Sequence, residues 1–321
     1  MKKFVITKTD DGIRLNRFLE RIVPSLPASL MYRYLRLKRI KVNGKKCEAS
    51  ARLNAGDELE LYINDDFFEQ ERALPDFMKA ARRLDVAYED DKIAVICKPA
   101  GIFCHSVYEA GSDTLVNRFL RYLYENGEYT PDASASFVPS LCNRLDHGTE
   151  GLVLAAKTSE AARAVNNAIK HDRIKKTYLC AAWGKAPKEG VYTAYLTKDE
   201  PSNTATVADR PSDGAKEIVT AFRPLAVTGK LALLEVGLIT GRSHQIRAHL
   251  AFLGCPVIGD AKYGSTEINR RYRLPSQALC SYKLEFEPDA EADGAIYYLD
   301  KKVVETDKVS FLEALFPGFK I

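Results

Sequence analysis

Several signatures of common enzyme and membrane-protein classes are missing from this sequence of 321 residues. It has one tryptophan and three methionines, and its seven cysteines include no C-x-x-C pair. That spacing excludes a zinc ribbon, and unpaired cysteines in odd number favour free thiols in a reducing compartment over a disulfide framework. No apolar run approaches the ~18 residues that span a bilayer. The sequence has neither a dinucleotide fingerprint nor a P-loop, so we expect no nucleotide cofactor.

The composition is that of a globular protein with an uneven distribution of charge. Hydrophobic residues make up 46% of the chain and charged residues 28%, and the formal net charge is +4. Residues 1–46 contain 13 lysines and arginines but only 3 acidic residues, so this end carries +10 and the remainder −6. A basic end on a mildly acidic body indicates contact with nucleic acid. The N-terminal residues lack the apolar segment of a signal peptide, so we expect a cytoplasmic protein without a membrane segment.

Residues 143–154, NRLDHGTEGLVL, place one aspartate between a polar and an apolar segment. Residues 151–156 are short, apolar and bounded by turn and charge signals, which is typical of a buried strand. Asp146 is therefore expected at the mouth of a sheet, where its side chain can face a cleft. Arg144 would point to the same side in an extended stretch, because side chains alternate with a period of two. On these residues alone, an aspartate that caps a turn beside a surface ion pair is the simpler interpretation.

A second stretch follows about a hundred residues later, GRSHQIRAHL at 241–250 and GCPVIGDAKYG at 254–264. The pattern predicts a helix that ends near Gly254, because glycine commonly follows the last helical residue. His244 and Arg247 lie three positions apart and would share a helix face. His244 and His249 lie five apart, which does not fit the zinc-binding H-E-x-x-H motif, and we expect no metal.

The two stretches resemble, in order, the motifs of the RNA pseudouridine synthases, and the second resembles the RluA-type branch of that family. The resemblance implies an α+β fold with a mixed, mainly antiparallel central sheet flanked by helices. It also implies that Asp146 is the catalytic carboxylate and Arg247 its ion-pair partner. Residues 175–178, KKTY, resemble the family stretch whose tyrosine stands beside the target base, which assigns that role to Tyr178.

The implied reaction moves the ribose from a nitrogen to a carbon of the same base, and it needs no redox cofactor or group donor. It does need one ionised carboxylate. A carboxylate in an apolar cleft loses its charge to desolvation unless a cation offsets it, which is the role expected of Arg247. A stacked base must also be flipped out, at a cost of a few kcal/mol. Arg144 is expected to brace the vacated position, and His244 is expected among the RNA-binding residues.

The basic N-terminal end has a pattern of its own. Two helices are expected, at residues 13–22 and from Ser29 onward, the second with Leu30, Tyr34 and Leu37 as its apolar face. Asn-Gly at 43–44 is a hairpin signal, and a strand should follow near residues 58–62. The order resembles an S-four-like RNA-binding module. Its expected phosphate contacts are Arg33, Arg36, Lys38, Arg39 and Lys41.

These patterns predict three parts, namely the RNA-binding module at 1–62, a linker at 63–85 and the catalytic domain at 86–321. Within the last, Lys98 and His105 follow a predicted strand and could line the cleft, although lone residues of this kind more often have structural roles. A helix is expected at 113–124 with Asp113 as its N-cap. Residues 289–321 carry no functional signal.

Two residues depart from the commonest family pattern, since Asn143 stands where many RluA-type members carry His and Glu150 where many carry Ser. Neither change touches Asp146, but both leave the substrate open. Two other functions remain possible. One is an RNA-binding protein that keeps the fold without catalysis, and the other is a hydrolase with Glu150 as a second acid. We expect a monomer that acts on RNA, ribosomal RNA in preference to transfer RNA.

Overall fold

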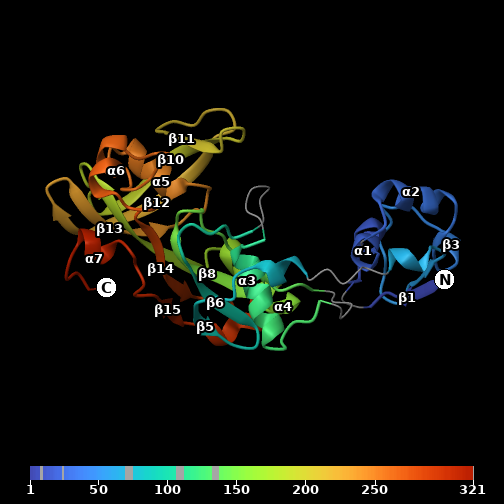
Figure 1. Cartoon of the computed structure of the whole chain (residues 1–321). Helices are drawn as coiled ribbons and strands as arrows, with labels where there is room; N and C mark the ends of the chain where they lie inside the picture. The colour runs from blue at the N-terminus through green and yellow to red at the C-terminus, as the bar shows by residue number, and fades with distance from the viewer. Residues whose placement is uncertain (8–9, 24, 69–74, 106–111, 132–136, 321) are drawn as a thin grey trace. The chain divides into compact units, whose positions relative to one another are not determined.

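The computed structural model describes residues 1–7, 10–23, 25–68, 75–105, 112–131 and 137–320. The chain forms two compact units, Met1–Pro75 with Tyr129–Val138, and Asp76–Glu128 with Pro139–Ile321 (Figure 1). We call them the small unit and the large unit. The predicted linker contains two short 3-10 helices, η2 (Asp65–Phe67) and η3 (Asp76–Lys79), and its residues 69–74 lie outside the described ranges. The predicted functional division at residues 62 and 85 remains a prediction.

The small unit is a four-stranded antiparallel sheet with two helices. The strands are β1 (Lys2–Val5), β2 (Ile40–Val42), β3 (Lys45–Lys46) and β4 (Glu58–Leu61), in the spatial order β1-β4-β2-β3. The helices are α1 (Leu15–Ile22) and α2 (Ala28–Arg36). Leu15, Leu19 and Leu59 lie in one buried core. Both helices and the strand at β4 were expected, whereas β1 was not.

The buried face of α2 differs from the expected one. Met31 and Leu35 are buried, whereas Leu37 is 55% exposed and Leu30 and Tyr34 are only partly buried. The helix ends at Arg36, so Leu37 lies beyond its last turn and cannot continue the stripe. The predicted face of Leu30, Tyr34 and Leu37 was therefore wrong, since the buried pair, Met31 and Leu35, lies one position further along the helix.

The hairpin between β2 and β3 was predicted correctly. Asn43 and Gly44 have φ angles of 49° and 72°, and positive φ at both central residues is what a two-residue type I′ turn requires. The Asn43 side chain donates to the Asp57 carboxylate (2.7 Å) and accepts from the Glu58 amide (2.8 Å). The turn is thereby tied to the start of β4.

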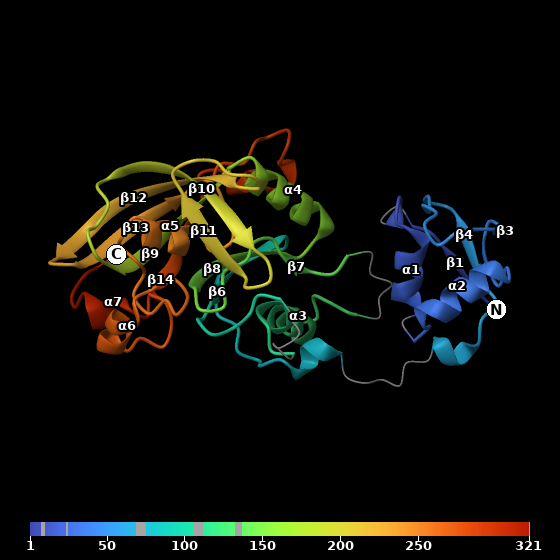
Figure 2. The same ribbon diagram turned by 90° about the horizontal axis from the view of Figure 1, so that it is seen from above.

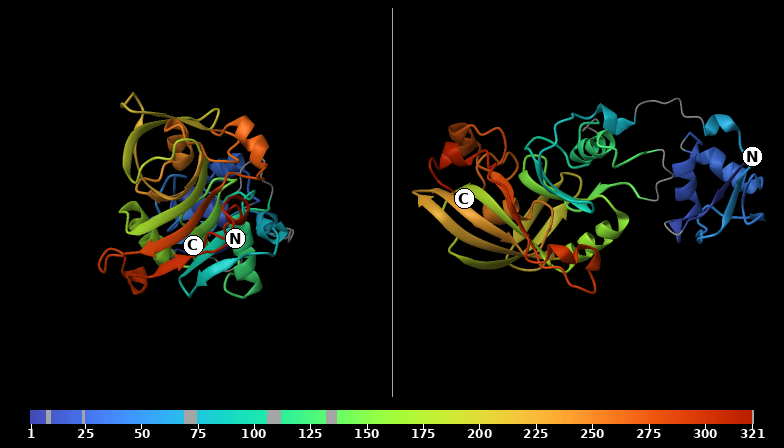
Figure 3. Two further views of the ribbon diagram at one scale, coloured as in Figure 1. Left: turned by 90° about the vertical axis from the view of Figure 1, so that its left-hand side faces the viewer. Right: turned by 90° about the horizontal axis from the view of Figure 1, so that it is seen from below.

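The large unit is built on one eleven-stranded sheet with the order β11-β10-β12-β13-β9-β14-β8-β6-β5, to which β7 adds beside β8 and β15 beside β14. Its strands are β5 (Val86–Glu89), β6 (Ile93–Lys98), β7 (Ser140–Leu141), β8 (Glu150–Ala156), β9 (Ile174–Trp183), β10 (Gly190–Asp199), β11 (Thr204–Ala208), β12 (Lys216–Thr228), β13 (Leu231–Leu238), β14 (Leu279–Phe286) and β15 (Val303–Glu305). Among the strands of the described ranges, β8 and β14 are the only parallel pair. The expected mixed, mainly antiparallel sheet is confirmed, and Figures 2 and 3 show its long twisted strands.

Helices line this sheet and position the motifs. They are α3 (Leu115–Glu125), α4 (Ser159–Lys170), α5 (Gln245–Phe252), α6 (Thr266–Tyr272) and α7 (Leu312–Leu315). The N-cap of α3 is Thr114, whose hydroxyl accepts from the Asn117 amide, and not Asp113 as expected. Asp113 instead forms an ion pair with Arg118 at 2.7 Å, so its carboxylate oxygens bind the guanidinium and not the first amides of the helix. Among the described residues, no helix is long and apolar enough to cross a membrane.

The C-terminal segment, for which no function was predicted, completes the core of the large unit. After the 3-10 helix η4 (Gly294–Leu299), β15 extends the sheet beside β14. Phe311, Leu312 and Phe316 are buried in a cluster that also contains Leu179 of β9 and Tyr282 of β14. Burial of three large apolar side chains contributes several kcal/mol, roughly 2 kcal/mol for each, so the segment is structural.

Candidate active site

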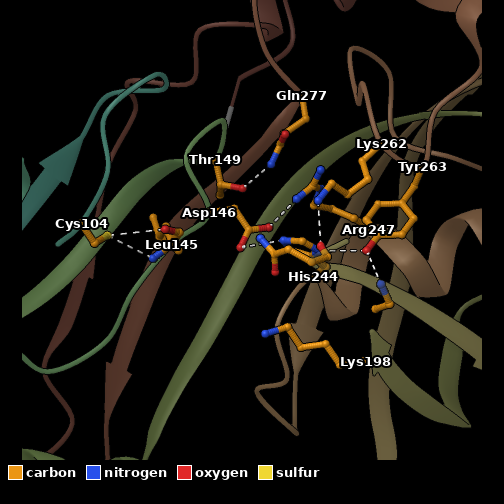
Figure 4. Close-up of polar contacts among 12 residues, drawn as sticks. Cys104, Leu145, Asp146, Thr149, Lys198, His244, Arg247, Lys262, Tyr263 and Gln277 are labelled. Atoms are coloured by element: carbon orange, nitrogen blue, oxygen red, sulfur yellow. Dashed lines mark hydrogen bonds and ion pairs between the residues drawn. The ribbon is translucent and has the colours of Figure 1, made fainter. Parts of the chain in front are cut away.

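Asp146 lies in the loop that joins β7 to β8, at the end of the fully buried strand β8 (Figure 4). The loop closes in a turn in which the Thr149 amide donates to the Asp146 carbonyl at 3.0 Å. The amide of Gln277 donates to the Thr149 hydroxyl at 2.8 Å. Asn143 accepts from the Leu154 amide at 2.7 Å, so this departure from the family pattern has a structural role in the loop. The Asp146 backbone is thereby fixed while its side chain stays 24% exposed.

Gly151 allows β8 to start directly after this turn. Its φ angle is +113°, and a Cβ at this position would lie 2.2 Å from the Ser281 carbonyl oxygen of β14. The close approach of β8 to β14 therefore requires glycine here. The Thr-x-Gly element of the first motif thus brings the Asp146 loop against the centre of the sheet.

Lys98 holds the same loop in place through hydrogen bonds to backbone carbonyls. Its side chain is buried, and its ammonium donates to the carbonyls of Pro99 (3.0 Å), His147 (3.1 Å) and Thr149 (2.8 Å). Burial lowers the Lys98 pKa to about 8. Lys98 does not line the cleft and has the structural role that lone residues of this kind more often have, because its charge is used on backbone carbonyls of the loop. His105 is exposed and does not line the cleft either.

Arg247 of α5 joins the two motifs. Its guanidinium donates to Asp146 Oδ2 at 2.8 Å, and a second edge donates to both oxygens of Asp260 at 2.8 and 2.9 Å. Arg247 is 7% exposed and Asp260 is fully buried. The expected proximity of Asp146 and Arg247 is therefore observed, although the residues are 101 positions apart.

The charges of this group are mutually dependent. Burial opposes ionisation of Arg247, but the hydrogen bonds and charge of Asp260, together with Asp146, raise its pKa. Burial likewise acts to raise the pKa of Asp260, but the hydrogen bonds and charge of Arg247, together with the backbone amides of Tyr263 and Lys262, outweigh burial and lower that pKa. One permanent cation thus faces two carboxylates, of which only Asp146 reaches the cleft.

His244 faces the other oxygen of Asp146. Its Nε2 lies 3.9 Å from Asp146 Oδ1, and its Nδ1 lies 2.8 Å from the Tyr263 hydroxyl. Burial lowers the His244 pKa, Asp146 acts in the opposite direction, and the Arg247 charge lowers it further. The imidazole is therefore neutral at physiological pH. The sequence placed His244 among the RNA-binding residues, and the structure places it beside the carboxylate.

Tyr178 of β9 lies in the wall of the same cleft. It is 5% exposed, and its neighbours across the sheet are Val236 of β13 and Ser281 of β14. Burial and the charge of Asp146 raise its pKa, so the phenol is protonated at neutral pH. The strand thus presents an aromatic ring to the cleft that contains Asp146.

The cleft has a volume of about 580 Å³, and its mouth is basic. Arg144 and Arg242 are exposed at it, together with Lys170 at the end of α4, while Lys176 of β9 is half-buried. One exposed acid, Asp172, lies among them. A cleft of this size holds one nucleoside, and the cations around it can contact the phosphates on either side.

Glu150 does not join Asp146. Its Oε1 accepts from the Ser310 amide (2.8 Å) and hydroxyl (2.9 Å), and its side chain lines a separate cavity. Neighbouring side chains in β8 alternate, so Glu150 faces away from the cleft. The hydrolase hypothesis needed Glu150 as a second acid beside Asp146, and that geometry is absent.

The five basic residues of the small unit form a separate set. Arg33, Arg36, Lys38 and Arg39 are exposed and Lys41 is half-buried. Arg39 lies over the Tyr34 ring and Lys41 over the Tyr62 ring. None of the five forms an ion pair with a described carboxylate, so their charges are available to an anionic partner.

Three residues of the site were missed by the sequence reasoning. Asp260 and Tyr263 were part of the second motif but had no assigned role, and Gln277 carried no signal at all. The spacing of Asp260 and Tyr263 within G-D-A-K-Y-G could have marked them, because both follow the tight turn at Gly259 (φ +78°). Gln277 lies far away in sequence from Thr149, and only the fold brings them together.

Comparison with known proteins identifies the family. The family model for RNA pseudouridylate synthase matches residues 92–252, half of the chain. An uncharacterised RNA pseudouridine synthase of Mycoplasma pneumoniae is 30% identical over 88% of each chain. The ribosomal large subunit pseudouridine synthase C of Rickettsia felis is 33% identical over 90% of this chain and 96% of its own.

Solved structures agree at the level of the fold. The human RNA pseudouridylate synthase domain containing 4 aligns with a TM-score of 0.55 and 21% identity, covering 72% of this chain and 92% of that one. Together with the family match and the relatives, which span most of the chain, this settles the assignment. The chain belongs to the RNA pseudouridine synthase family, in its RluA-type branch, and is an isomerase of uridine in RNA.

Proposed function

We propose that Asp146 is the carboxylate with which this enzyme converts uridine in RNA to pseudouridine. The observation that supports this is the contact between Asp146 Oδ2 and Arg247 at 2.8 Å, in a cleft large enough for a nucleoside. A guanidinium held in place by a buried acid gives the neighbouring carboxylate a fixed, charge-assisted hydrogen bond. An ionised carboxylate with one oxygen free is suited to attack the ribose or to stabilise the charge that develops there.

The other residues of the cleft have distinct proposed roles. Tyr178, which burial keeps protonated, is proposed as a flat packing surface for the target base and not as a resting proton acceptor. Arg144 is exposed at the mouth, where it would brace the space that the flipped base leaves in the RNA. Arg247 is proposed to orient Asp146 and to supply the neighbouring positive charge, without touching the base.

We propose ribosomal RNA as the substrate, because the relative from Rickettsia felis is named for the large ribosomal subunit. Residues 1–62 are proposed as an S-four-like module whose basic residues contact phosphates and increase affinity for folded RNA. We further propose that the protein acts as a monomer in the cytoplasm, without cofactor or metal. All seven cysteines are free, which suits a reducing compartment.

The proposed role of Asp146 is tested by Asp146→Asn, with Asp172→Asn as the matched control. Asp172 is a second aspartate of the same cleft that contacts no described guanidinium, and its φ of 55° is one that asparagine tolerates. Loss of the uridine C5 hydrogen from isotopically labelled RNA reports turnover, and filter binding reports affinity. We expect Asp146→Asn to bind RNA but not to turn over, and Asp172→Asn to remain active.

Two results would contradict this proposal. Turnover by Asp146→Asn would remove the carboxylate from the chemistry. RNA binding by the wild-type protein without any pseudouridine, on ribosomal and transfer RNA alike, would favour the binding-only function. Mapping pseudouridines in both RNA classes from a strain that lacks the gene identifies the substrate.

A further inference from the structure

His244 has an unusual backbone conformation for its position. It is the residue before α5, and its φ of 58° and ψ of 13° lie in the left-handed region, which non-glycine residues rarely adopt. Its side chain makes no capping hydrogen bond to the helix. Strain of this kind persists where the surrounding structure holds a side chain in place, and here it directs the imidazole toward Asp146 (Figure 4).

The proton on the His244 ring is assigned by its neighbour Tyr263. The Tyr263 oxygen accepts from the Ala205 amide of β11 at 2.7 Å and lies 2.8 Å from His244 Nδ1. Among the described residues, His244 is the only acceptor within hydrogen-bonding distance of this hydroxyl. Since an amide can only donate, the single phenolic proton goes to Nδ1. The neutral imidazole therefore carries its own proton on Nε2.

The Nε2–H group then points into the reaction site, where none of the described residues accepts a hydrogen bond from it. Its distance of 3.9 Å to Asp146 Oδ1 is too long for a hydrogen bond, and the side chain is 10% exposed in the cleft. Asp146 uses its other oxygen for Arg247. An atom of the substrate that comes to rest beside the ribose carbon and Asp146 would complete the bonding of His244.

We propose that His244 is a neutral hydrogen-bond donor to a carbonyl oxygen of the target uracil, fixed in that form by Tyr263. This rests on the proposed role of Asp146. When the bond between ribose C1′ and uracil N1 breaks, its electron pair stays on the base and spreads to the ring carbonyl oxygens. The base then joins C1′ through C5, and overall one proton passes from C5 to N1. A fixed donor at a carbonyl oxygen stabilises the charged base in between.

A neutral donor suits this site better than a charged one. The charged groups that face the imidazole are Asp146, Asp260, Arg247 and Lys262, and Tyr263 is the titratable group in direct contact. An imidazolium would pair with Asp146 and compete with Arg247 for it. The neutral form leaves the Asp146 carboxylate to the ribose.

The tautomer can be measured on the free protein by nitrogen NMR of the histidine rings, so the result does not depend on the role of Asp146. His244 should show the Nε2–H form in the wild type, and a mixture of tautomers in Tyr263→Phe. An Nδ1–H form in the wild type would overturn the proposal. So would an unchanged tautomer in a folded Tyr263→Phe variant.

The donor role is tested by His244→Gln and His244→Ala, which share the same backbone strain and differ in the donor. Rates are measured in single turnovers at saturating RNA, and affinity is measured separately. His244→Ala should lower the rate about 100-fold, the usual effect of removing one such donor, with RNA affinity within about twofold of wild type. His244→Gln, whose amide can donate, should react at least about tenfold faster than His244→Ala.

Two outcomes would contradict the donor role. Equal rates for the Gln and Ala variants would show that the donor is irrelevant. Loss of RNA affinity with the rate intact would make His244 an RNA-binding residue instead. Inactivity of Asp146→Asn with full activity of His244→Ala would refute this inference while leaving the proposed function in place.

Discussion

Asp260 holds Arg247 by both of its oxygens, at 2.8 and 2.9 Å, while Arg247 offers its remaining edge to Asp146. Asp260, which does not line the cleft, thus fixes the Arg247 guanidinium that orients the Asp146 carboxylate. Bidentate pairing fixes the plane of the guanidinium, which a lysine could not reproduce. The position of Asp146 therefore depends on a buried pair, and disturbing that pair should affect stability and catalysis together.

Asp260→Asn is expected to lower the unfolding free energy by about 3 kcal/mol, because it leaves a buried guanidinium without its counter-charge. The single-turnover rate should fall as well, since Arg247 loses its fixed plane. Urea unfolding and turnover measure the two effects, with Asp172→Asn as control. Burial acts to raise the pKa of Asp260, but the hydrogen bonds and charge of Arg247 and two backbone amides lower it overall, so its stabilising contribution is present above the unfolded pKa, near 4.

The sign of the pH effect follows from that shift. As pH falls through the folded pKa of Asp260, the carboxylate takes up a proton and its contribution is lost. The difference in stability between wild type and Asp260→Asn should therefore shrink in acid. A difference that stays constant down to the acid transition would show that the pair does not stabilise the fold.

Lys98 is expected to act on catalysis through the Asp146 loop, since it binds the carbonyls of His147 and Thr149. Lys98→Met should lower the single-turnover rate at least about tenfold with RNA affinity unchanged, because the loop loses its support. Lys92→Met is the matched control, since Lys92 also binds a carbonyl, that of Ala295, away from the site. Equal effects of the two variants would contradict this role.

The lowered Lys98 pKa, about 8 because of burial, should also affect how the unfolding free energy depends on pH. Between pH 8 and the unfolded value near 10.4, the unfolded chain binds more protons at this residue than the folded one. Stability should therefore rise with pH over this window in the wild type relative to Lys98→Met. Urea unfolding at pH 7.5 and pH 10 measures the difference, and parallel pH dependences in the two proteins would refute the shift.

Much of the site could be predicted because its residues lie in two short motifs with strong local patterns. The buried strand after Asp146 and the helix before Gly254 follow from apolar periodicity and from glycine at a helix end. The pairing of Asp146 with Arg247 came from the family resemblance, and the structure has it at 2.8 Å. Contacts within a motif, or between two motifs, can therefore be predicted from the sequence.

Contacts that depend on the fold alone cannot be predicted from the sequence in this way. Lys98 follows a predicted strand and was named as a residue that could line the cleft, but its burial is explained only by three carbonyls from two loops. Gln277 reaches Thr149 across 128 positions. The face of α2 was misplaced because the buried residues are Met31 and Leu35, one position after the predicted ones, and a shift of one residue turns a helix face by about 100°.

The basic residues of the small unit should determine the salt dependence of RNA binding. Arg33, Arg36 and Lys38 are the ones to replace, because they are exposed and, unlike Arg39 and Lys41, have no described aromatic ring beneath them. Glutamine at all three positions removes charge with little loss of side-chain length. Each phosphate contact contributes about 0.7 to the slope of log affinity against log salt for single-stranded nucleic acid, so three contacts contribute about 2.

The triple variant should therefore bind ribosomal RNA more weakly at low salt, with a slope reduced by about 2. Its single-turnover rate at saturating RNA should be unchanged, because the Asp146 site is built entirely within the large unit. Replacing the exposed Lys185, Lys188 and Lys230 of the large unit by glutamine removes the same number of charges and is the matched control for a general loss of charge. A slope that falls equally in the control would assign the effect to net charge alone. A rate that falls in the triple variant at saturating RNA would mean that the small unit takes part in positioning the uridine. The proposed separation of RNA binding by the small unit from catalysis by the large unit would then be wrong.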